Sequence, residues 1–176
     1  MAKPSEIIKF CPKCGSSQFH YEDDNSFRCE SCDFHFFINS ASAVAAIIEN
    51  EAGEILLTIR GKEPQKGLLD LPGGFVDPGE TIEDALKREV KEELNLQVTQ
   101  TDYLVSFPNE YVFSGYSVYT LDLAFVCKVK DFNKIEANDD VAGYQFFSHK
   151  EVDFKKVGLK SIKNILKYYI SYRKKG

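Results

Sequence analysis

Residues 74–96 constrain this chain more than any other stretch of its sequence. They combine a glycine turn, a helix start and a run of glutamates. Because residues three and four apart are neighbours on a helix surface, Glu89, Glu92 and Glu93 are expected to project to the same side. Like charges so placed repel, and a hard cation such as Mg²⁺, which prefers oxygen ligands, would reverse that penalty. A solvated acidic helix face is the alternative that these three residues alone leave open.

The same helix carries an apolar stripe that would anchor it in a core. Thr81 is the expected N-cap, since its hydroxyl can accept a hydrogen bond from the first turn. The stripe comprises Ile82, Ala85, Leu86, Val90 and Leu94. The glutamates are therefore predicted to lie beside a face that packing holds still, which is the support that a metal site requires.

The spacing of the whole stretch is Gly-x5-Glu-x7-Arg-Glu-Val-x-Glu-Glu-x-Asn-Leu. It closely resembles the Nudix box, Gly-x5-Glu-x7-Arg-Glu-U-x-Glu-Glu-x-Gly-U, in which U is a bulky apolar residue. Asn95 stands where the family has glycine. That position follows a helix and is expected to adopt the left-handed conformation, which asparagine tolerates better than most residues.

The remaining pattern predicts strands mixed with two helices, which indicates an α/β sandwich with helices on opposite faces. The Nudix resemblance implies the same fold, an α/β/α sandwich around a mixed sheet. The predicted elements are a buried strand at 42–49, a strand paired with it at 54–60, strand-like segments within 96–107 and 116–129, a short strand at 144–147 and a final helix at 159–172.

The resemblance also implies an activity, hydrolysis of a nucleoside diphosphate linked to another group with the help of Mg²⁺ or Mn²⁺. By motif position, Glu92 and Glu93 are the expected direct metal ligands. Glu89 is expected to be a ligand or the general base, and the backbone carbonyl of Gly73 a further ligand.

Glu80 and Arg88 complete the expected catalytic set. Glu80 is predicted to act as an outer partner, and Arg88 to orient a glutamate through a charge-assisted hydrogen bond, with an ordinary surface ion pair as its alternative. In some Nudix enzymes the general base comes from a later loop. Asp139 and Asp140 are candidates of that kind, beside the reading of a solvated polar loop.

Four of the five cysteines form two Cys-x2-Cys pairs separated by fourteen residues, Cys11, Cys14, Cys29 and Cys32. Four thiolates satisfy tetrahedral Zn²⁺ and can fold a segment too small for its own core. Two disulfides or a redox pair are the alternatives, and a chain without a secretion signal disfavours disulfides. We predict a zinc ribbon at residues 1–39, followed by the Nudix hydrolase domain at residues 40–176.

A zinc ribbon before a Nudix domain resembles the NADH pyrophosphatases. Those enzymes carry Ser-Gln-Pro-Trp-Pro-Phe-Pro-x-Ser after the box, whereas residues 105–115 read Val-Ser-Phe-Pro-Asn-Glu-Tyr-Val-Phe-Ser-Gly and the chain has no tryptophan. NADH, an ADP-ribose-like compound and a (d)NTP therefore all stay open as substrates. Four aromatic residues of this region could stack on a base or pack in the core: Phe107, Tyr111, Phe113 and Tyr116.

The charge and hydropathy of the chain limit the classes of binding partner that we expect. With a net charge of −5, bulk attraction to nucleic acid is not expected, and no apolar run is long enough to span a membrane. The expectation is a cytoplasmic hydrolase with a nucleotide-type substrate, in which the ribbon stabilises the chain or contacts a second copy in a homodimer. The competing function is a Nudix-like regulator that binds a nucleotide-sugar without cleaving it, although a pure binder would not need the complete set of acids.

Overall fold

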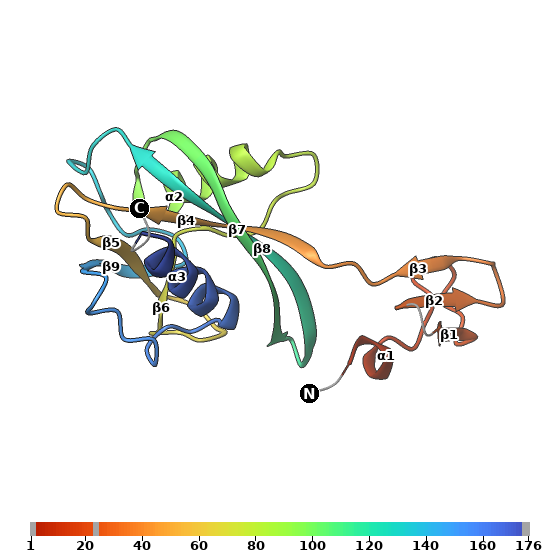
Figure 1. Cartoon of the computed structure of the whole chain (residues 1–176). Helices are drawn as coiled ribbons and strands as arrows, with labels where there is room; N and C mark the ends of the chain where they lie inside the picture. The colour runs from red at the N-terminus through yellow and green to blue at the C-terminus, as the bar shows by residue number, and fades with distance from the viewer. Residues whose placement is uncertain (1–2, 23–24, 174–176) are drawn as a thin grey trace. The chain divides into compact units, whose positions relative to one another are not determined.

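The computed structural model describes residues 3–22 and 25–173 of the chain. It divides into two compact units, residues 1–40 with 110–119 and residues 41–109 with 120–176 (Figure 1).

The first unit contains an antiparallel sheet with strand order β1-β2-β3. Its elements are the short helix α1 (Pro4–Ile7) and the strands β1 (Phe19–Glu22), β2 (Ser26–Cys29) and β3 (His35–Phe37). Phe27 sits in the middle strand opposite Tyr21 and Phe36, and its ring stacks on Phe19 with 5.1 Å between centroids. The core of this unit is small, with Phe19 and Phe27 buried together with Cys11 and Cys29. Even with the partly buried residues around them, so few apolar side chains bury little surface, and a further source of stability is expected for this unit.

The second unit is built on two three-stranded sheets, ordered β4-β8-β7 and β6-β5-β9, except that the end of β7 and the start of β8, within residues 110–119, belong to the first unit. Strands β4 and β8 run parallel, whereas β5 pairs antiparallel with both β6 and β9, so the unit mixes both kinds of pairing. The strands are β4 (Ala41–Ile48), β5 (Ile55–Arg60), β6 (Leu69–Asp70), β7 (Val98–Phe113), β8 (Tyr116–Val129) and β9 (Val141–Phe147).

Two helices, α2 (Ile82–Leu94) and α3 (Lys160–Arg173), pack on opposite faces of β4. Successive side chains of a strand point to opposite faces. Accordingly, Val44, Ala46 and Ile48 belong to the apolar cluster that includes α2, whereas Ala45 and Ile47 belong to the cluster that includes α3. Figure 1 shows α2 in green and α3 in blue on different sides of the strands. The predicted α/β/α sandwich is therefore confirmed.

The predicted pairing of the strands at 42–49 and 54–60 is wrong. A single isolated bridge, Glu49 with Ile55, joins them, and β4 instead lies along β8 from Ala41 to Ile48. Both faces of β4 are apolar, so this strand is stable only between two covering layers, as is typical of strands in parallel pairing. The turn after β4 therefore carries the chain into the second sheet.

Both ends of α2 follow the local sequence signals. The Thr81 hydroxyl accepts a hydrogen bond from the Asp84 amide at 3.2 Å, which makes it the N-cap. Asn95 has φ = 55° in the left-handed region, and its amide donates to the Lys91 carbonyl at 2.9 Å. The predicted stripe is buried at Ala85, Leu86, Val90 and Leu94. No helix in the described part of the chain is long and apolar enough to cross a membrane.

Candidate active site and cysteine cluster

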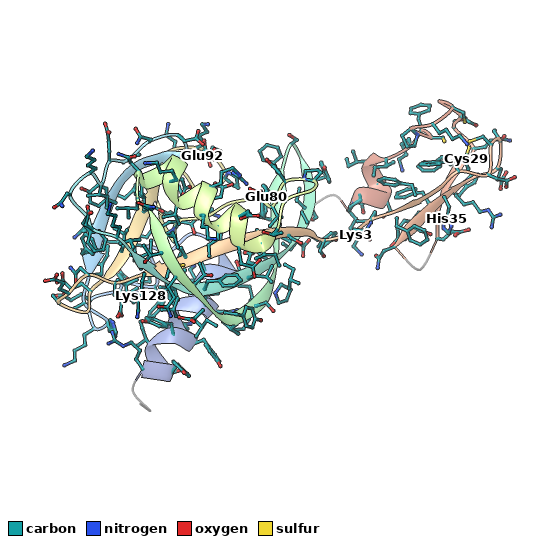
Figure 2. The ribbon with its side chains drawn as sticks, turned by 90° about the horizontal axis from the view of Figure 1, so that it is seen from above. Lys3, Cys29, His35, Glu80, Glu92 and Lys128 are labelled. Carbon is teal, nitrogen blue, oxygen red and sulfur yellow. The ribbon has the colours of Figure 1, made fainter. Side chains whose placement is uncertain are left out.

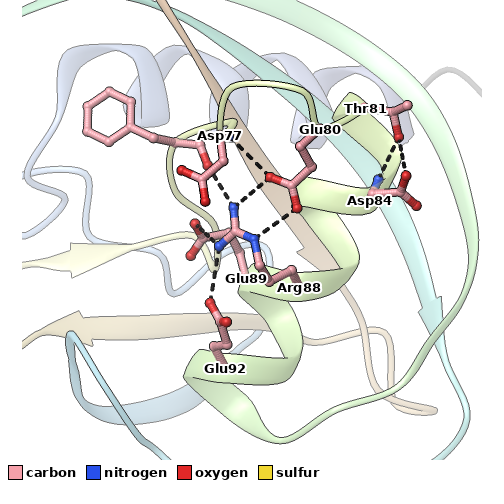
Figure 3. Close-up of polar contacts among 8 residues, drawn as sticks. Asp77, Glu80, Thr81, Asp84, Arg88, Glu89 and Glu92 are labelled. Atoms are coloured by element: carbon pink, nitrogen blue, oxygen red, sulfur yellow. Dashed lines mark hydrogen bonds and ion pairs between the residues drawn. The ribbon is translucent and has the colours of Figure 1, made fainter.

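Arg88 is the centre of the polar network on α2 (Figure 3). Its Nε and one terminal nitrogen donate to the two carboxylate oxygens of Glu80, both at 2.9 Å. The other terminal nitrogen donates to Glu89 at 2.8 Å and to Glu92 at 3.1 Å. The guanidinium also donates to the Phe75 carbonyl at 3.0 Å. Arg88 therefore joins the loop before α2 to two glutamates of the helix, which is more than the surface ion pair weighed as its alternative.

The electrostatics of this network follow from partial burial. Hydrogen bonding by Arg88 holds the pKa of Glu80 below its ordinary value, and the carboxylates around Arg88 raise the pKa of its guanidinium. Glu89 has a side chain only 14% exposed, and burial raises its pKa despite the contact with Arg88. Glu92 is 50% exposed. Figure 2 labels Glu80 before α2 and Glu92 near its end, so this network lies along the helix.

Glu93 turns inward toward the loop before the helix. It is buried at 7% exposure, and its Oε2 accepts a hydrogen bond from the Gly73 amide at 2.9 Å. Burial raises its pKa to about 8, because a carboxylate loses hydration in the interior. A bound cation would favour the ionised form of Glu93. The sequence predicted a role for the Gly73 carbonyl, and the contact present in the structure is made by its amide.

Gly73 and Gly74 let the loop come close to its neighbours. A Cβ on Gly73, whose φ is +146°, would lie 2.0 Å from the Val44 carbonyl oxygen, so backbone of β4 occupies that space. A Cβ on Gly74 would lie 2.5 Å from the carboxyl carbon of Glu89. The two glycines thus seat the loop against β4 on one side and against a predicted ligand on the other.

The carboxylates are near one another but not gathered around a single point. Glu89 and Glu92 share a nitrogen of Arg88, whereas Glu93 points to Gly73. Among the residues that the structure describes, the cysteines alone form a group of at least three ligands with all ligand atoms within 4.8 Å. The donors on α2 are nevertheless hard carboxylate oxygens, which suit Mg²⁺ or Mn²⁺.

The four predicted zinc ligands do come together. The Sγ atoms of Cys11 and Cys32 are 3.8 Å apart, and those of Cys14 and Cys29 are 3.6 Å apart. Four thiolates at the usual Zn–S distance on a tetrahedron would be separated by about 3.8 Å. All four cysteines are free thiols, so the disulfide alternative is wrong for this structure. Figure 2 labels Cys29 within this unit. The cluster is thus compatible with a tetrahedral metal ion.

The loop acids Asp139 and Asp140 lie near the glutamates although they are far away in sequence. The Asn138 amide donates to the Glu93 carbonyl at 2.9 Å, which docks the loop on the end of α2. Lys62 forms ion pairs with both aspartates. Lys62 was not singled out from the sequence, because nothing local relates it to residues 139 and 140.

The aromatic residues proposed for stacking do not act as one set. Phe107 is half-buried against the core of the second unit, whereas Phe113 is 53% exposed. Phe75, which the sequence did not single out, is 46% exposed beside the Arg88 network.

A polar surface pocket at the end of α2 is distinct from this network. None of the predicted site residues lines it. Its lining consists of Lys91, Asn95, Gln97, Lys130, Asp131, Asn133 and Lys134. The carboxylates and this pocket therefore do not coincide, and we place the candidate site at the carboxylates because their donors match a divalent cation.

Comparisons with known proteins bear on the family to which this chain belongs. The family model described as NUDIX domain matches residues 39–169. The NAD-capped RNA hydrolase NudC of Deinococcus radiodurans is 34% identical over 119 residues, which are 66% of this chain and 42% of that protein. The ADP-ribose pyrophosphatase of Methanocaldococcus jannaschii is 48% identical over 63 residues, 36% of this chain and 37% of that protein. The chain thus spans about two fifths of the length of these curated relatives.

Among solved structures, a NUDIX hydrolase from Nitrosomonas europaea superposes with a TM-score of 0.73 and 23% identity, covering 96% of this chain and 94% of that one. This likeness shows the fold. The family match covers most of the sequence and includes the entire Arg88 network. The chain therefore belongs to the Nudix family.

Proposed function

We propose that this protein is a metal-dependent Nudix pyrophosphohydrolase that cleaves the pyrophosphate bond of a nucleoside diphosphate linked to another group. The observation that carries the proposal is the network in which Arg88 joins Glu80, Glu89 and Glu92 beside the buried Glu93. A regulator that only binds a nucleotide-sugar has no use for so many carboxylates held together on one helix.

In this proposal Glu92 and Glu93 are direct ligands of Mg²⁺ or Mn²⁺, with Glu89 as a further ligand or as the general base, and the Gly73 carbonyl as another oxygen donor. The ion, when bound, would neutralise phosphoryl oxygens and lower the pKa of a coordinated water. Glu80 and Arg88 orient the glutamates, because the guanidinium donates to each of the carboxylates around it. Gly73 keeps the Glu93 carboxylate directed at the loop through its amide.

The substrate class follows from the chemistry that the relatives' names share. NAD and ADP-ribose both contain ADP joined through its diphosphate to a second ribose, and the names of two relatives include one or the other. We propose ADP-linked diphosphates as the substrate class. NAD-capped RNA belongs in the test although the net charge of −5 does not favour nucleic acid.

For the N-terminal segment we propose a zinc ribbon at residues 1–39 that precedes the hydrolase domain at residues 40–176. Zinc would replace the apolar core that this segment is too small to build. Its four ligands would be the thiolates of Cys11, Cys14, Cys29 and Cys32.

The test is a product-resolved screen of NADH, ADP-ribose, NAD-capped RNA and (d)NTPs with Mg²⁺ or Mn²⁺. Glu92→Gln and Glu93→Gln should each lower kcat/KM by about 100-fold or more, because an uncharged amide is a poor ligand for a hard cation. Glu83→Gln is the matched control, since Glu83 is exposed in the first turn of the same helix. Full turnover in both site variants would refute the site, and binding without turnover by the unaltered protein would favour the regulator.

A further inference from the structure

The loop that carries Asp139 and Asp140 is fixed to the carboxylate end of α2. Glu136 and Asn138 donate backbone hydrogen bonds to the Leu94 and Glu93 carbonyls at 3.1 and 2.9 Å. These two hydrogen bonds place the loop that contains Asp139 and Asp140 directly beside the end of α2.

The end of β5 meets this loop in close contact. The Gly61 amide donates to the Asp140 carbonyl at 2.6 Å, and a Cβ on Gly61 would lie 2.8 Å from the same oxygen. A shift of register between Ile59 and Arg60 brings the strand end into this position. The next residue, Lys62, is thereby held at the aspartates, with its Nζ 3.7 Å from Asp139 and paired with Asp140.

Arg88 and Lys62 are two cations near the carboxylates, and they differ in how far their hydrogen-bond donors are already engaged. The donors of Arg88 are engaged by Glu80, Glu89, Glu92 and a backbone carbonyl, and its side chain is 28% exposed. Lys62 is 63% exposed, and its partners Asp139 and Asp140 are 55% and 54% exposed. Exposed ion pairs contribute only about 0–1 kcal/mol, so a lysine on a flexible stem can exchange such partners at little cost.

We propose that Lys62 is a substrate-binding residue that contacts the diphosphate of the substrate, and that Asp139 and Asp140 hold its ammonium group at the site before the substrate arrives. This inference rests on the proposed function. It adds Lys62, which lies outside the Nudix box, to the residues of the site. An ammonium group binds phosphate as a point charge and does not need the fixed planar geometry of a guanidinium group. It can therefore exchange the two aspartates for the diphosphate.

A purely structural role for Lys62 makes a different prediction. The backbone hydrogen bond from Gly61 to Asp140 already ties β5 to the loop, and it does not depend on the side chain of Lys62. Loss of the ammonium group should therefore weaken substrate binding and leave the loop in place.

The experiment compares the unaltered protein with Lys62→Ala, Lys62→Arg and Lys66→Ala, all with ADP-ribose and Mg²⁺. Lys66 is an exposed lysine of the same loop and is the matched control. Lys62→Ala should raise KM about tenfold while kcat changes less than about threefold, which is the signature of lost binding that is equal in ground and transition states. Lys62→Arg should recover most of the affinity for ADP-ribose. Lys66→Ala should have the same KM and kcat as the unaltered protein.

Calorimetric Kd values for ADP-ribose, measured on the same variants without added divalent cation so that no cleavage occurs, separate this inference from the proposed function. A Kd raised by Lys62→Ala in a protein that shows no turnover would support the inference and contradict the hydrolase. Normal turnover with KM and Kd of Lys62→Ala within about twofold of the unaltered protein would overturn the inference alone. A lowered Tm with unchanged KM would show that Lys62 only stabilises the loop and would also overturn the inference. Failure of the unaltered protein to bind ADP-ribose and to cleave any compound of the screen would overturn both proposals.

Discussion

The cysteine cluster and the glutamate network are two candidate metal centres built on different plans. The four sulfur atoms lie within 4.8 Å of one another, with the 3.6 and 3.8 Å separations that a tetrahedral ion requires. The glutamates are instead spread between Arg88 and Gly73, and their exposure ranges from a buried Glu93 to a half-exposed Glu92. The cysteine centre is closed, because four thiolates complete the coordination of a tetrahedral ion. The glutamate centre is open, because its carboxylates would leave coordination positions free for water and substrate.

The difference follows from the size of the apolar core beside each centre. Where the core consists of a few aromatic rings and the cysteines, a closed set of ligands can supply the missing stability. The helix that carries the glutamates is already anchored by a large apolar cluster. Its carboxylates can therefore be held by hydrogen bonds and stay free to accept a cation and a substrate, as an open catalytic site requires.

The largest effect is expected from breaking the closed centre. Cys29→Ser should reduce bound zinc from about one ion per chain to nearly none, because structural zinc contributes on the order of 10 kcal/mol to such segments. Elemental analysis measures the zinc, and proteolysis should then cut within residues 3–40. Cys127→Ser is the control, since Cys127 is buried in β8 and does not belong to the group of four cysteines. Zinc retained at full stoichiometry by Cys29→Ser would contradict the four-thiolate assignment.

An intermediate effect is expected at the open centre from Gly74→Ala. The new methyl group would meet the Glu89 carboxylate, a flexible side-chain end, so that Glu89 should move while the fold stays. We expect kcat/KM to fall about tenfold or more with little change in Tm, as measured by steady-state kinetics and thermal melts.

Two other glycines serve as controls for that variant. Gly73→Ala should damage folding itself, because its methyl group would meet backbone of β4, and Gly143→Ala should be nearly neutral, because its nearest contact is an ordinary 3.6 Å. Equal activity in Gly74→Ala and Gly143→Ala would mean that the position of Glu89 does not matter.

The smallest effect is expected at the start of the supporting helix. Thr81→Ala removes the hydroxyl that accepts from the Asp84 amide and should lower the free energy of unfolding by about 1 kcal/mol, as measured by urea denaturation. Thr81→Ser should restore most of the stability. A loss of turnover much larger than this loss of stability would indicate that the cap positions Glu80, which directly precedes it.

The local features of the second unit could be predicted because they depend on residues close in sequence. The N-cap at Thr81, the left-handed Asn95 and the buried stripe of α2 each follow from the conformational preferences of a few neighbouring residues. The partner of β4 could not be predicted in the same way. Its turn favours a hairpin, but the requirement to cover both of its faces overrides that preference and selects β8.

The sequence by itself determined the ligand types: hard carboxylates at helical spacing in one segment and paired thiols in another. It also determined that Arg88 lies one helical turn from Glu92, because helix geometry relates them directly. Only the tertiary structure decided that the Gly73 amide faces Glu93, and that Lys62 meets Asp139 and Asp140 beside the same helix. Those contacts join residues separated by tens of positions, and they exist because the loops that bear them pack against α2.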